Sequence, residues 1–371
     1  MVCQRVLSVV GARPQFIKAA VVSRIFLESS NVREILVHTG QHYDEGMSDV
    51  FFEQLSIPAP AYNLSVGSGS HGQQTGRMLE KIEEIVRTEK PDWVLVYGDT
   101  NSTLAGTLAA SKLHVPVAHV EAGLRSFNRR MPEEQNRIVS DHLATLLLTP
   151  TETANRNLAN EGILGNKVRL VGDVMYDATL FASGQSSAGK NVLDDLDVAE
   201  GSFVLSTIHR AENTDDPKRL AAIIDGLRIV AKEMPVLLPL HPRTRKLLEK
   251  TGSSDDTTKG LTLLEPVGYF EMAALEEKAA LIATDSGGIQ KEAYFHATPC
   301  VTLRDETEWI ELVELGWNIV QPPVSAQAVA ATILSRIGTK GRVGTKPYGE
   351  GNAGRRVVDA LLEKQSYTND R

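Results

Sequence analysis

A turn with almost no side-chain bulk joins an apolar run to a helix-like pattern late in this chain. The run 280–283 leads through an acid into Ser286, Gly287 and Gly288. Paired glycines let a ligand approach the backbone, a serine can cap the next helix, and the N–H groups of a first helical turn favour a phosphate. Glu292, about a turn and a half later, can take the two hydroxyls of a ribose. We predict a nucleotide site without a Walker lysine; a glycine-rich connection with no ligand is the alternative.

Two cations follow the first apolar run of the chain. Arg13 and Lys18 stand where a helix is expected to begin, and Pro14 suits a first helical turn. The segment lacks the G-x-G-x-x-G pattern of dinucleotide sites, so the two cations indicate a phosphorylated or carboxylated ligand. A basic pair on an ordinary surface is the alternative.

Three acids occupy comparable places in the first half of the chain. Asp99 and Glu121 each follow a short apolar run, and Glu133 stands at a helix start that a proline predicts. Ligands of open parallel sheets bind beyond the carboxyl ends of the strands, so the acids are expected to converge on one cleft.

Each acid also has a plain structural explanation. Glu133 and Arg137 have the spacing of an i,i+4 ion pair, Glu134 could be an ordinary solvated acid, and Asp99 could be only a helix cap.

Two histidines end apolar runs in the second half. His209 and His241 can each pair with a phosphate or carboxylate, with Arg210 in support, although a lone histidine is more often a structural group. His38 and His42 have i,i+4 spacing, but a glycine between them interrupts any helix, so we expect no zinc there.

The elements that must position these residues follow a β–α–β rhythm, which is typical of parallel sheets covered by helices on both faces. We therefore predict an α/β protein with two doubly wound domains, residues 1–172 with 352–371 and residues 173–351, in which a helical segment at 353–364 returns to the first domain. The predicted strands are 5–10, 34–37, 93–97, 115–120, 145–149, 168–171, 203–208, 236–240, 261–264, 280–283 and 299–303.

Length and composition agree with two domains. A chain of 371 residues exceeds one ordinary core, and its net charge of -8 argues against a nucleic-acid partner. The apolar run at the amino end is too short for a signal peptide or a membrane span, so a cytoplasmic protein is expected. Cys3 and Cys300 lie beside apolar residues and are predicted to be small buried hydrophobes rather than a disulfide or metal ligands.

Taken in order, the motifs closely resemble those of the non-hydrolysing UDP-N-acetylglucosamine 2-epimerases. The segments that carry the resemblance are GARPQFIK (11–18), TGQH (39–42), GDT (98–100), HVEAGLR (119–125), PEEQNR (132–137), HRAEN (209–213) and TDSGGIQKE (284–292). The resemblance implies a GT-B fold of two Rossmann-like domains with a UDP-sugar in the interdomain cleft, and a homodimer. It also implies interconversion of UDP-GlcNAc and UDP-ManNAc for cell-surface polysaccharide precursors, with no metal and no other cofactor.

The resemblance assigns roles to individual residues. Asp99, Glu121 and Glu133 match the catalytic acids, and His209 matches the catalytic-site histidine near the diphosphate. We expect the substrate and its UDP to be bound by Arg13, Lys18, Arg137, His241, Phe270, Ser286, Gly287, Gly288 and Glu292.

The chemistry of a 2-acetamido sugar makes sense of this set. Its C2 proton is weakly acidic, so abstraction becomes feasible only when the anomeric C–O bond breaks and an oxocarbenium-like centre forms. Anti elimination then gives a glycal and UDP, and re-addition with a proton delivered to the opposite face inverts C2. This route needs acids on both faces of the ring and cations around the diphosphate.

Several residues depart from the branch of the family that acts on UDP-GlcNAc. The pairs Gln15–Phe16 and Trp309–Ile310 differ from it, and the segments 67–75 and 125–130 look like the branch that acts on UDP-2,3-diacetamido-2,3-dideoxyglucuronate. The carboxylate of that sugar would suit Arg129, Arg130 or Arg304. More remote alternatives are a GT-B glycosyltransferase, which would not explain the acids, and a sugar-nucleotide-binding protein without turnover.

Overall fold

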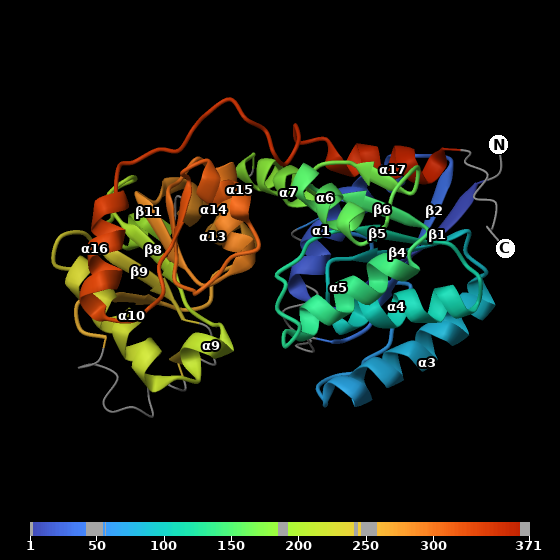
Figure 1. Cartoon of the computed structure of the whole chain (residues 1–371), viewed down its shortest axis with the longest axis horizontal. Helices are drawn as coiled ribbons and strands as arrows, with labels where there is room; N and C mark the ends of the chain where they lie inside the picture. Colours follow the sequence, from blue (N-terminus) through green and yellow to red (C-terminus); the bar gives the residue numbers. More distant parts are fainter. Residues whose placement is uncertain are drawn as a thin grey trace. The chain divides into compact units, whose positions relative to one another are not determined.

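The chain forms two compact units, each built on its own parallel sheet (Figure 1). The structure is a computed structural model and describes residues 3–41, 55, 57–184, 192–240, 244–245 and 258–363. Unit 1 comprises Met1–Ala178 and Lys346–Arg371, and unit 2 comprises Thr179–Thr345. The first boundary falls inside helix α7 (Val174–Ser183).

Unit 1 holds a seven-stranded sheet in the order β3-β2-β1-β4-β5-β6-β7, with neighbouring strands parallel. Its strands are β1 (Gln4–Val10), β2 (Val32–His38), β3 (Tyr62–Asn63), β4 (Trp93–Tyr97), β5 (Val117–Val120), β6 (Leu146–Thr149) and β7 (Val168–Leu170). Its other helices are α1 (Arg13–Glu28), α3 (His71–Glu89), α4 (Asn101–Lys112), α5 (Pro132–Leu143), α6 (Glu152–Asn160) and α17 (Ala353–Leu362). Parallel strands need such crossover helices to connect them.

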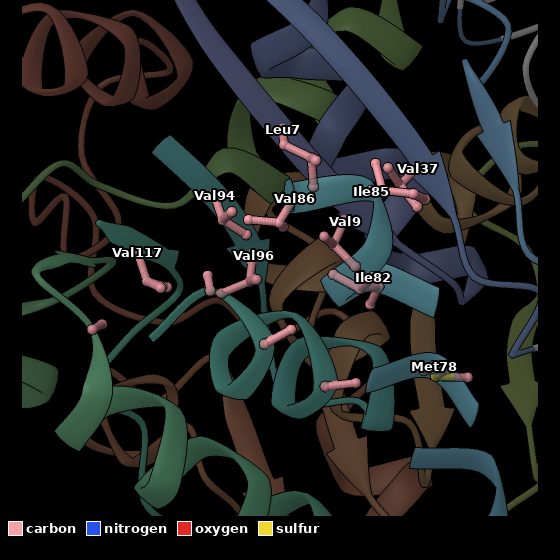
Figure 2. Close-up of a cluster of buried hydrophobic side chains, with 14 of the residues drawn as sticks. Leu7, Val9, Val37, Met78, Ile82, Ile85, Val86, Val94, Val96 and Val117 are labelled. Atoms are coloured by element: carbon pink, nitrogen blue, oxygen red, sulfur yellow. The ribbon is translucent and has the colours of Figure 1, made fainter. Parts of the chain in front are cut away.

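The core on one face of this sheet is made by apolar side chains of alternate strand positions. Val9 of β1 and Val96 of β4 are fully buried with Ile82 of α3 in one cluster (Figure 2). Helix α4 approaches closely because a Cβ added at Gly106 would lie 3.1 Å from Val96 Cγ1. Residues two apart in a strand share a face, so this pattern orients the whole strand.

The C-terminal helix α17 packs against α1 within unit 1. A Cβ added at Gly354 would lie 2.5 Å from Val21 Cγ1, so only glycine permits this approach. The carboxylate of Asp177 accepts hydrogen bonds from the backbone N–H groups of Ala353 and Gly354, at 3.1 and 2.9 Å. This carboxylate satisfies N–H groups that a helix start leaves without helical partners.

Unit 2 holds a six-stranded parallel sheet in the order β10-β9-β8-β11-β12-β13. Its strands are β8 (Val204–Thr207), β9 (Val236–Pro239), β10 (Thr262–Leu264), β11 (Leu281–Thr284), β12 (Cys300–Thr302) and β13 (Asn318–Val320). Its helices are α9 (Ala211–Thr214), α10 (Pro217–Val230), α13 (Tyr269–Lys278), α14 (Gly287–Phe295), α15 (Ile310–Glu314) and α16 (Ala326–Arg336).

Alternate residues of the unit 2 strands enter separate apolar clusters. Val204 of β8 joins the cluster that contains Ile223 of α10 and Val329 of α16. The next residue, Leu205, joins the cluster that contains Leu275 of α13. The sheet is therefore covered on both faces, as the rhythm of the sequence predicted.

The predicted strands are confirmed, with ends that agree or differ by at most two residues. Two further strands, β3 and β13, escaped prediction because segments of two and three residues at sheet edges show no periodicity. The predicted burial of Cys3 is wrong: it is exposed just before β1. Cys300 is buried in β12, and burial raises the pKa of its thiol to about 12. Within the described part of the chain, no helix is both long enough and apolar enough to cross a bilayer.

Candidate active site

Several of the predicted site residues follow the strands at which each sheet changes its winding direction. In unit 1 the strand order reverses between β1 and β4, and in unit 2 it reverses between β8 and β11. Ligands of doubly wound sheets bind beyond the carboxyl ends of strands at this switch point. Asp99 follows β4 and His209 closely follows β8, so each unit carries predicted chemistry at this place.

Helix α1 begins at Arg13 with Pro14 in its first turn, as predicted. The part-exposed Arg13 is the first helical residue. Gln15 then ties α1 to β4: its Oε1 accepts from Gly11 N at 2.8 Å, and its Nε2 donates to the Tyr97 carbonyl at 2.8 Å. The start of α1 is thus held against the strand end that precedes Asp99.

Lys18 of α1 forms an ion pair with Glu121, the residue directly after β5. Both side chains are largely buried. A Cβ at Gly98 would lie only 3.2 Å from the Lys18 ammonium, so the glycine leaves room for this cation. Glu121 has a φ of 70°, a conformation that non-glycine residues rarely adopt. Such backbone strain is typical of functional sites.

Asp99 is not a helix cap. The cap of α4 is Thr100, whose side chain accepts a hydrogen bond from Thr103 N. The Asp99 carboxylate instead accepts a hydrogen bond from Arg137 Nη2 at 2.5 Å, and the Asp99 side chain is 31% exposed. Asn136 Nδ2 donates to the Asp99 carbonyl at 2.9 Å. The acid is therefore held from α5 and remains accessible to a ligand.

Arg137 also forms an ion pair with Glu134 of the same helix, α5. Arg137 Nη1 donates to Glu134 Oε2 at 2.6 Å, and Glu134 is buried, so the interpretation of Glu134 as a solvated acid is wrong. Its two oxygens also accept from Ser126 N and Phe127 N at 2.9 Å each. Glu133 is part-exposed in the first turn of α5, as predicted for a helix that begins at Pro132.

The turn after β11 has the predicted strand-to-helix form. Ser286 is the cap of α14, and its hydroxyl accepts from Ile289 N. Arg210 Nη2 would lie 3.5 Å from a Cβ at Gly287, so a cation stands beside the positive end of the helix. A helix start with a neighbouring guanidinium suits a phosphate.

A buried carboxylate holds the His209 loop against this turn. Asp285 accepts from His209 N at 3.1 Å, from Arg210 N at 3.0 Å and from Asn213 Nδ2 at 3.0 Å. The His209 ring is 39% exposed, and its Nδ1 lies 3.5 Å from Asp285 Oδ1. The sequence offered Asp285 only as part of a glycine-rich turn, because its partners lie more than seventy residues earlier in the chain.

The other predicted residues of unit 2 divide into three groups. Gly288 and Glu292 lie in α14, and a Cβ at Gly288 would be 3.9 Å from Glu292 Oε2. Phe270 lies in the first turn of α13, with its ring 6.2 Å from that of Phe181. His241 lies outside the described residues.

Arg304 is not placed as the sequence suggested. Its guanidinium is buried and donates to Glu308 at 2.9 Å and to Glu212 at 3.1 Å. Burial would raise the pKa of Glu308, but the Arg304 charge outweighs it and holds that pKa below its ordinary value. A guanidinium that already serves two carboxylates is a poor partner for the carboxylate of a substrate, so Arg129 and Arg130, both exposed, remain for that role.

The fold places this protein in a known structural class. Unit 1 carries carboxylates after its strands, and unit 2 carries a serine-capped helix start after β11. Two Rossmann-like domains of this kind form the GT-B fold of the structural relatives. The sequence profile of the UDP-N-acetylglucosamine 2-epimerase family matches residues 26–362, and the chain belongs to this family. Its homologues are isomerases.

The relatives match nearly the whole length of the chain. A UDP-2,3-diacetamido-2,3-dideoxy-D-glucuronate 2-epimerase of Pseudomonas aeruginosa is 49% identical over 97% of this chain and 99% of its own. A UDP-N-acetylglucosamine 2-epimerase of Methanocaldococcus jannaschii is 44% identical over 95% and 97%.

Solved structures agree with these relatives. The M. jannaschii enzyme in complex with UDP-GlcNAc and UDP has a TM-score of 0.87 at 43% identity, covering 97% of this chain and 99% of that one. The Neisseria meningitidis UDP-GlcNAc 2-epimerase bound to UDP-GlcNAc has a TM-score of 0.86 at 30% identity, covering 97% and 100%.

Proposed function

We propose that this protein interconverts UDP-GlcNAc and UDP-ManNAc without hydrolysing them. The observation that carries the proposal is the pair Asp99 and Glu121. These acids follow neighbouring strands of one sheet, and each is paired with a cation from a different helix. The structures of M. jannaschii and N. meningitidis relatives with UDP-GlcNAc support the choice of substrate.

The proposed reaction begins with cleavage of the anomeric C–O bond. UDP leaves with the bonding electrons, and a carboxylate removes the C2 proton to form a 2-acetamidoglycal. The UDP oxygen then adds back to C1 while a proton is delivered to the opposite face of C2, so atoms and charge balance. Asp99 and Glu121 would remove and deliver the C2 proton on the two faces of the sugar ring, and Glu133 would assist proton transfer.

Several residues would hold the departing diphosphate and its nucleoside. Ser286, Gly287 and Gly288 lie at the start of α14, where backbone N–H groups and the helix dipole favour anions. His209, Arg13 and Lys18 would add hydrogen bonds or positive charge that stabilise the leaving group. His241 and Phe270 would contact the nucleotide, and Glu292 would accept hydrogen bonds from its ribose.

A second substrate is favoured by one comparison and one structural feature. The P. aeruginosa relative at 49% identity is named for UDP-2,3-diacetamido-2,3-dideoxy-D-glucuronate. Arg129 and Arg130 are exposed in the loop before α5, where either guanidinium could pair with a sugar carboxylate.

Proton NMR in heavy water tests the reaction and the substrate together. Purified protein is incubated with UDP-GlcNAc in one tube and with the diacetamidoglucuronate nucleotide in another. The proposal expects the C2 epimer with deuterium at C2 from UDP-GlcNAc, and epimerisation of the second nucleotide alone would favour the alternative. UDP binding without C2 exchange in either tube contradicts epimerisation and directs attention to a glycosyltransferase.

The substitutions Arg129→Gln and Arg130→Gln separate the two substrates. If the sugar carboxylate binds this loop, they raise KM for the diacetamidoglucuronate nucleotide about tenfold and leave KM for UDP-GlcNAc nearly unchanged. Equal effects on both substrates would contradict a carboxylate contact.

The resemblance to the family also bears on oligomeric state and cellular location. We infer a homodimer that works in the cytoplasm on precursors of cell-surface polysaccharides. Sedimentation equilibrium of the purified chain tests the dimer, since a monomer mass at micromolar concentration contradicts it.

A further inference from the structure

A cluster of four ionisable side chains, three of them buried, adjoins the two loops that carry Asp99 and Glu121. His119 lies in β5, Asp141 in α5, Arg125 after β5 and Glu161 directly after α6. The side chains of His119 and Asp141 are fully buried, and that of Arg125 is 1% exposed. Burying charges is costly unless they are paired, so this cluster calls for a specific role.

Asp141 connects three segments through its two oxygens. Oδ1 lies 2.7 Å from His119 Nδ1, and Oδ2 accepts from Gly123 N at 3.0 Å and from Arg125 Nη1 at 2.7 Å. Burial alone would raise the pKa of Asp141, but His119 and Arg125 outweigh it and hold the pKa below its ordinary value. Asp141 is therefore an acceptor for all three donors.

His119 connects Asp141 to the loop before Asp99. Its Nε2 lies 2.7 Å from the Gly98 carbonyl, and its Nδ1 faces Asp141. A carbonyl and an ionised carboxylate can only accept hydrogen bonds, so the imidazole ring lies between two acceptors. The His119 ring thus lies between the Gly98 carbonyl, next to Asp99, and the Asp141 carboxylate. That carboxylate in turn accepts a hydrogen bond from Gly123 N, two residues after Glu121.

Arg125 and Glu161 anchor the second loop to α6. Arg125 Nε and Nη2 donate to the two oxygens of Glu161 at 2.6 and 2.8 Å. Asn157 of α6 donates to the Gly123 carbonyl at 3.0 Å. The main chain two residues after Glu121 is thus fixed through both its N–H and its C=O.

We propose that His119 and Asp141 are positioning residues that set the two catalytic-acid loops relative to each other. This inference rests on the proposed function, because it takes Asp99 and Glu121 as the acids that act at C2. The hydrogen bonds of the cluster end on main-chain atoms beside those acids, at Gly98 and Gly123. A displacement of about 1 Å in a reacting group costs roughly a hundredfold in rate, so such a cluster acts on turnover.

Two substitutions of His119 separate its two hydrogen bonds. In His119→Asn the amide can reach Asp141 in place of Nδ1, but the Gly98 carbonyl loses its donor. In His119→Gln the amide can reach Gly98 in place of Nε2, but Asp141 loses its donor. We expect kcat of the Asn variant to fall about ten- to a hundredfold, and that of the Gln variant to fall less. The KM for the UDP-sugar and the Kd for UDP are expected to stay within about threefold.

The readout separates positioning from stability. Values of kcat are corrected for the folded fraction by thermal unfolding, and Val86→Ala, a core substitution in α3 away from both loops, serves as a destabilised control with unchanged kcat. If both His119 variants keep the wild-type kcat per folded molecule, the inference is overturned while the proposed function stands. A wild-type protein without C2 exchange overturns both.

If neither His119 variant folds, Glu161→Ala tests the cluster from its part-exposed end. The side chain of Glu161 is 27% exposed, so its removal is tolerated more easily than a buried change. We expect kcat to fall about threefold through loss of the Arg125 anchor. An unchanged kcat in this variant overturns the inference.

Discussion

Arg137 Nη2 lies 2.5 Å from Asp99 Oδ2, although the two residues are 38 positions apart in the chain. The other terminal nitrogen of the same guanidinium donates to Glu134, which also holds the backbone of Ser126 and Phe127. One planar cation therefore connects the acid after β4 to the loop before α5. Its fixed fork of donors makes this possible.

Replacement of Arg137 by lysine is expected to lower kcat about ten- to a hundredfold. A lysine ammonium is a single point of charge and cannot hold Asp99 and Glu134 in the fixed geometry of a guanidinium. Steady-state kinetics of C2 exchange measures the change, with Asp99→Asn as the reference for complete loss of the acid. A Lys variant with the wild-type kcat would show that the geometry at Asp99 is unimportant.

The Lys18–Glu121 ion pair is expected to matter for stability as well as turnover. Lys18→Gln removes the cation that pairs with a largely buried carboxylate, and we expect a loss of about 3 kcal/mol in the free energy of unfolding. The double variant Lys18→Gln/Glu121→Gln should regain part of that loss while it remains inactive. Urea unfolding of the four proteins gives the coupling energy; strictly additive effects would contradict a direct interaction.

Gly123→Ala is expected to destabilise unit 1 by roughly 2–4 kcal/mol. Gly123 has a φ of 83°, and an added Cβ would lie 2.6 Å from the Ala154 carbonyl oxygen. Both features oppose any side chain at this position. Thermal unfolding measures the effect, and Gly162→Ala is the matched control because it has a φ of 77° but nothing within 4 Å of an added Cβ. Equal losses in the two variants would assign the whole effect to backbone conformation.

The raised pKa of Glu34 leads us to expect a specific dependence of folding stability on pH. Burial raises its pKa to about 6, which hydrogen bonds from Ser8 and Ser23 only partly oppose. The folded protein therefore binds more protons than the unfolded chain between about pH 4.5 and 6. Stability falls as pH rises through this window and stays lower above it, by about 2 kcal/mol.

The substitution Glu34→Gln isolates this contribution from those of other groups. We expect the variant to lose the downward slope between about pH 4.5 and 6 and to have a higher Tm than the wild type at pH 7. Chemical denaturation at several pH values measures the slope. Parallel curves for the two proteins would contradict a buried carboxyl with a raised pKa.

Local features of the sequence determined the elements and their starts. Pro14, Pro132 and Ser286 mark the first turns of α1, α5 and α14, as predicted. Such signals act within about four residues of the chain. A capping side chain accepts hydrogen bonds from N–H groups of the adjacent first turn, and a proline fixes the φ angle of its own residue. The alternation of apolar runs with amphipathic segments likewise determined the two parallel sheets.

Only the tertiary structure decided which charged groups meet. The sequence left open whether Asp99 caps a helix and whether Glu134 is solvated; in the fold Thr100 is the cap, and Glu134 is buried against Arg137. Arg304 had been a candidate for a substrate carboxylate and is instead paired within unit 2. The cluster around Asp141 showed no local pattern, because its partner His119 lies 22 residues away. Pairing of this kind depends on strand order and on the seating of helices on a sheet, which no short window of sequence contains.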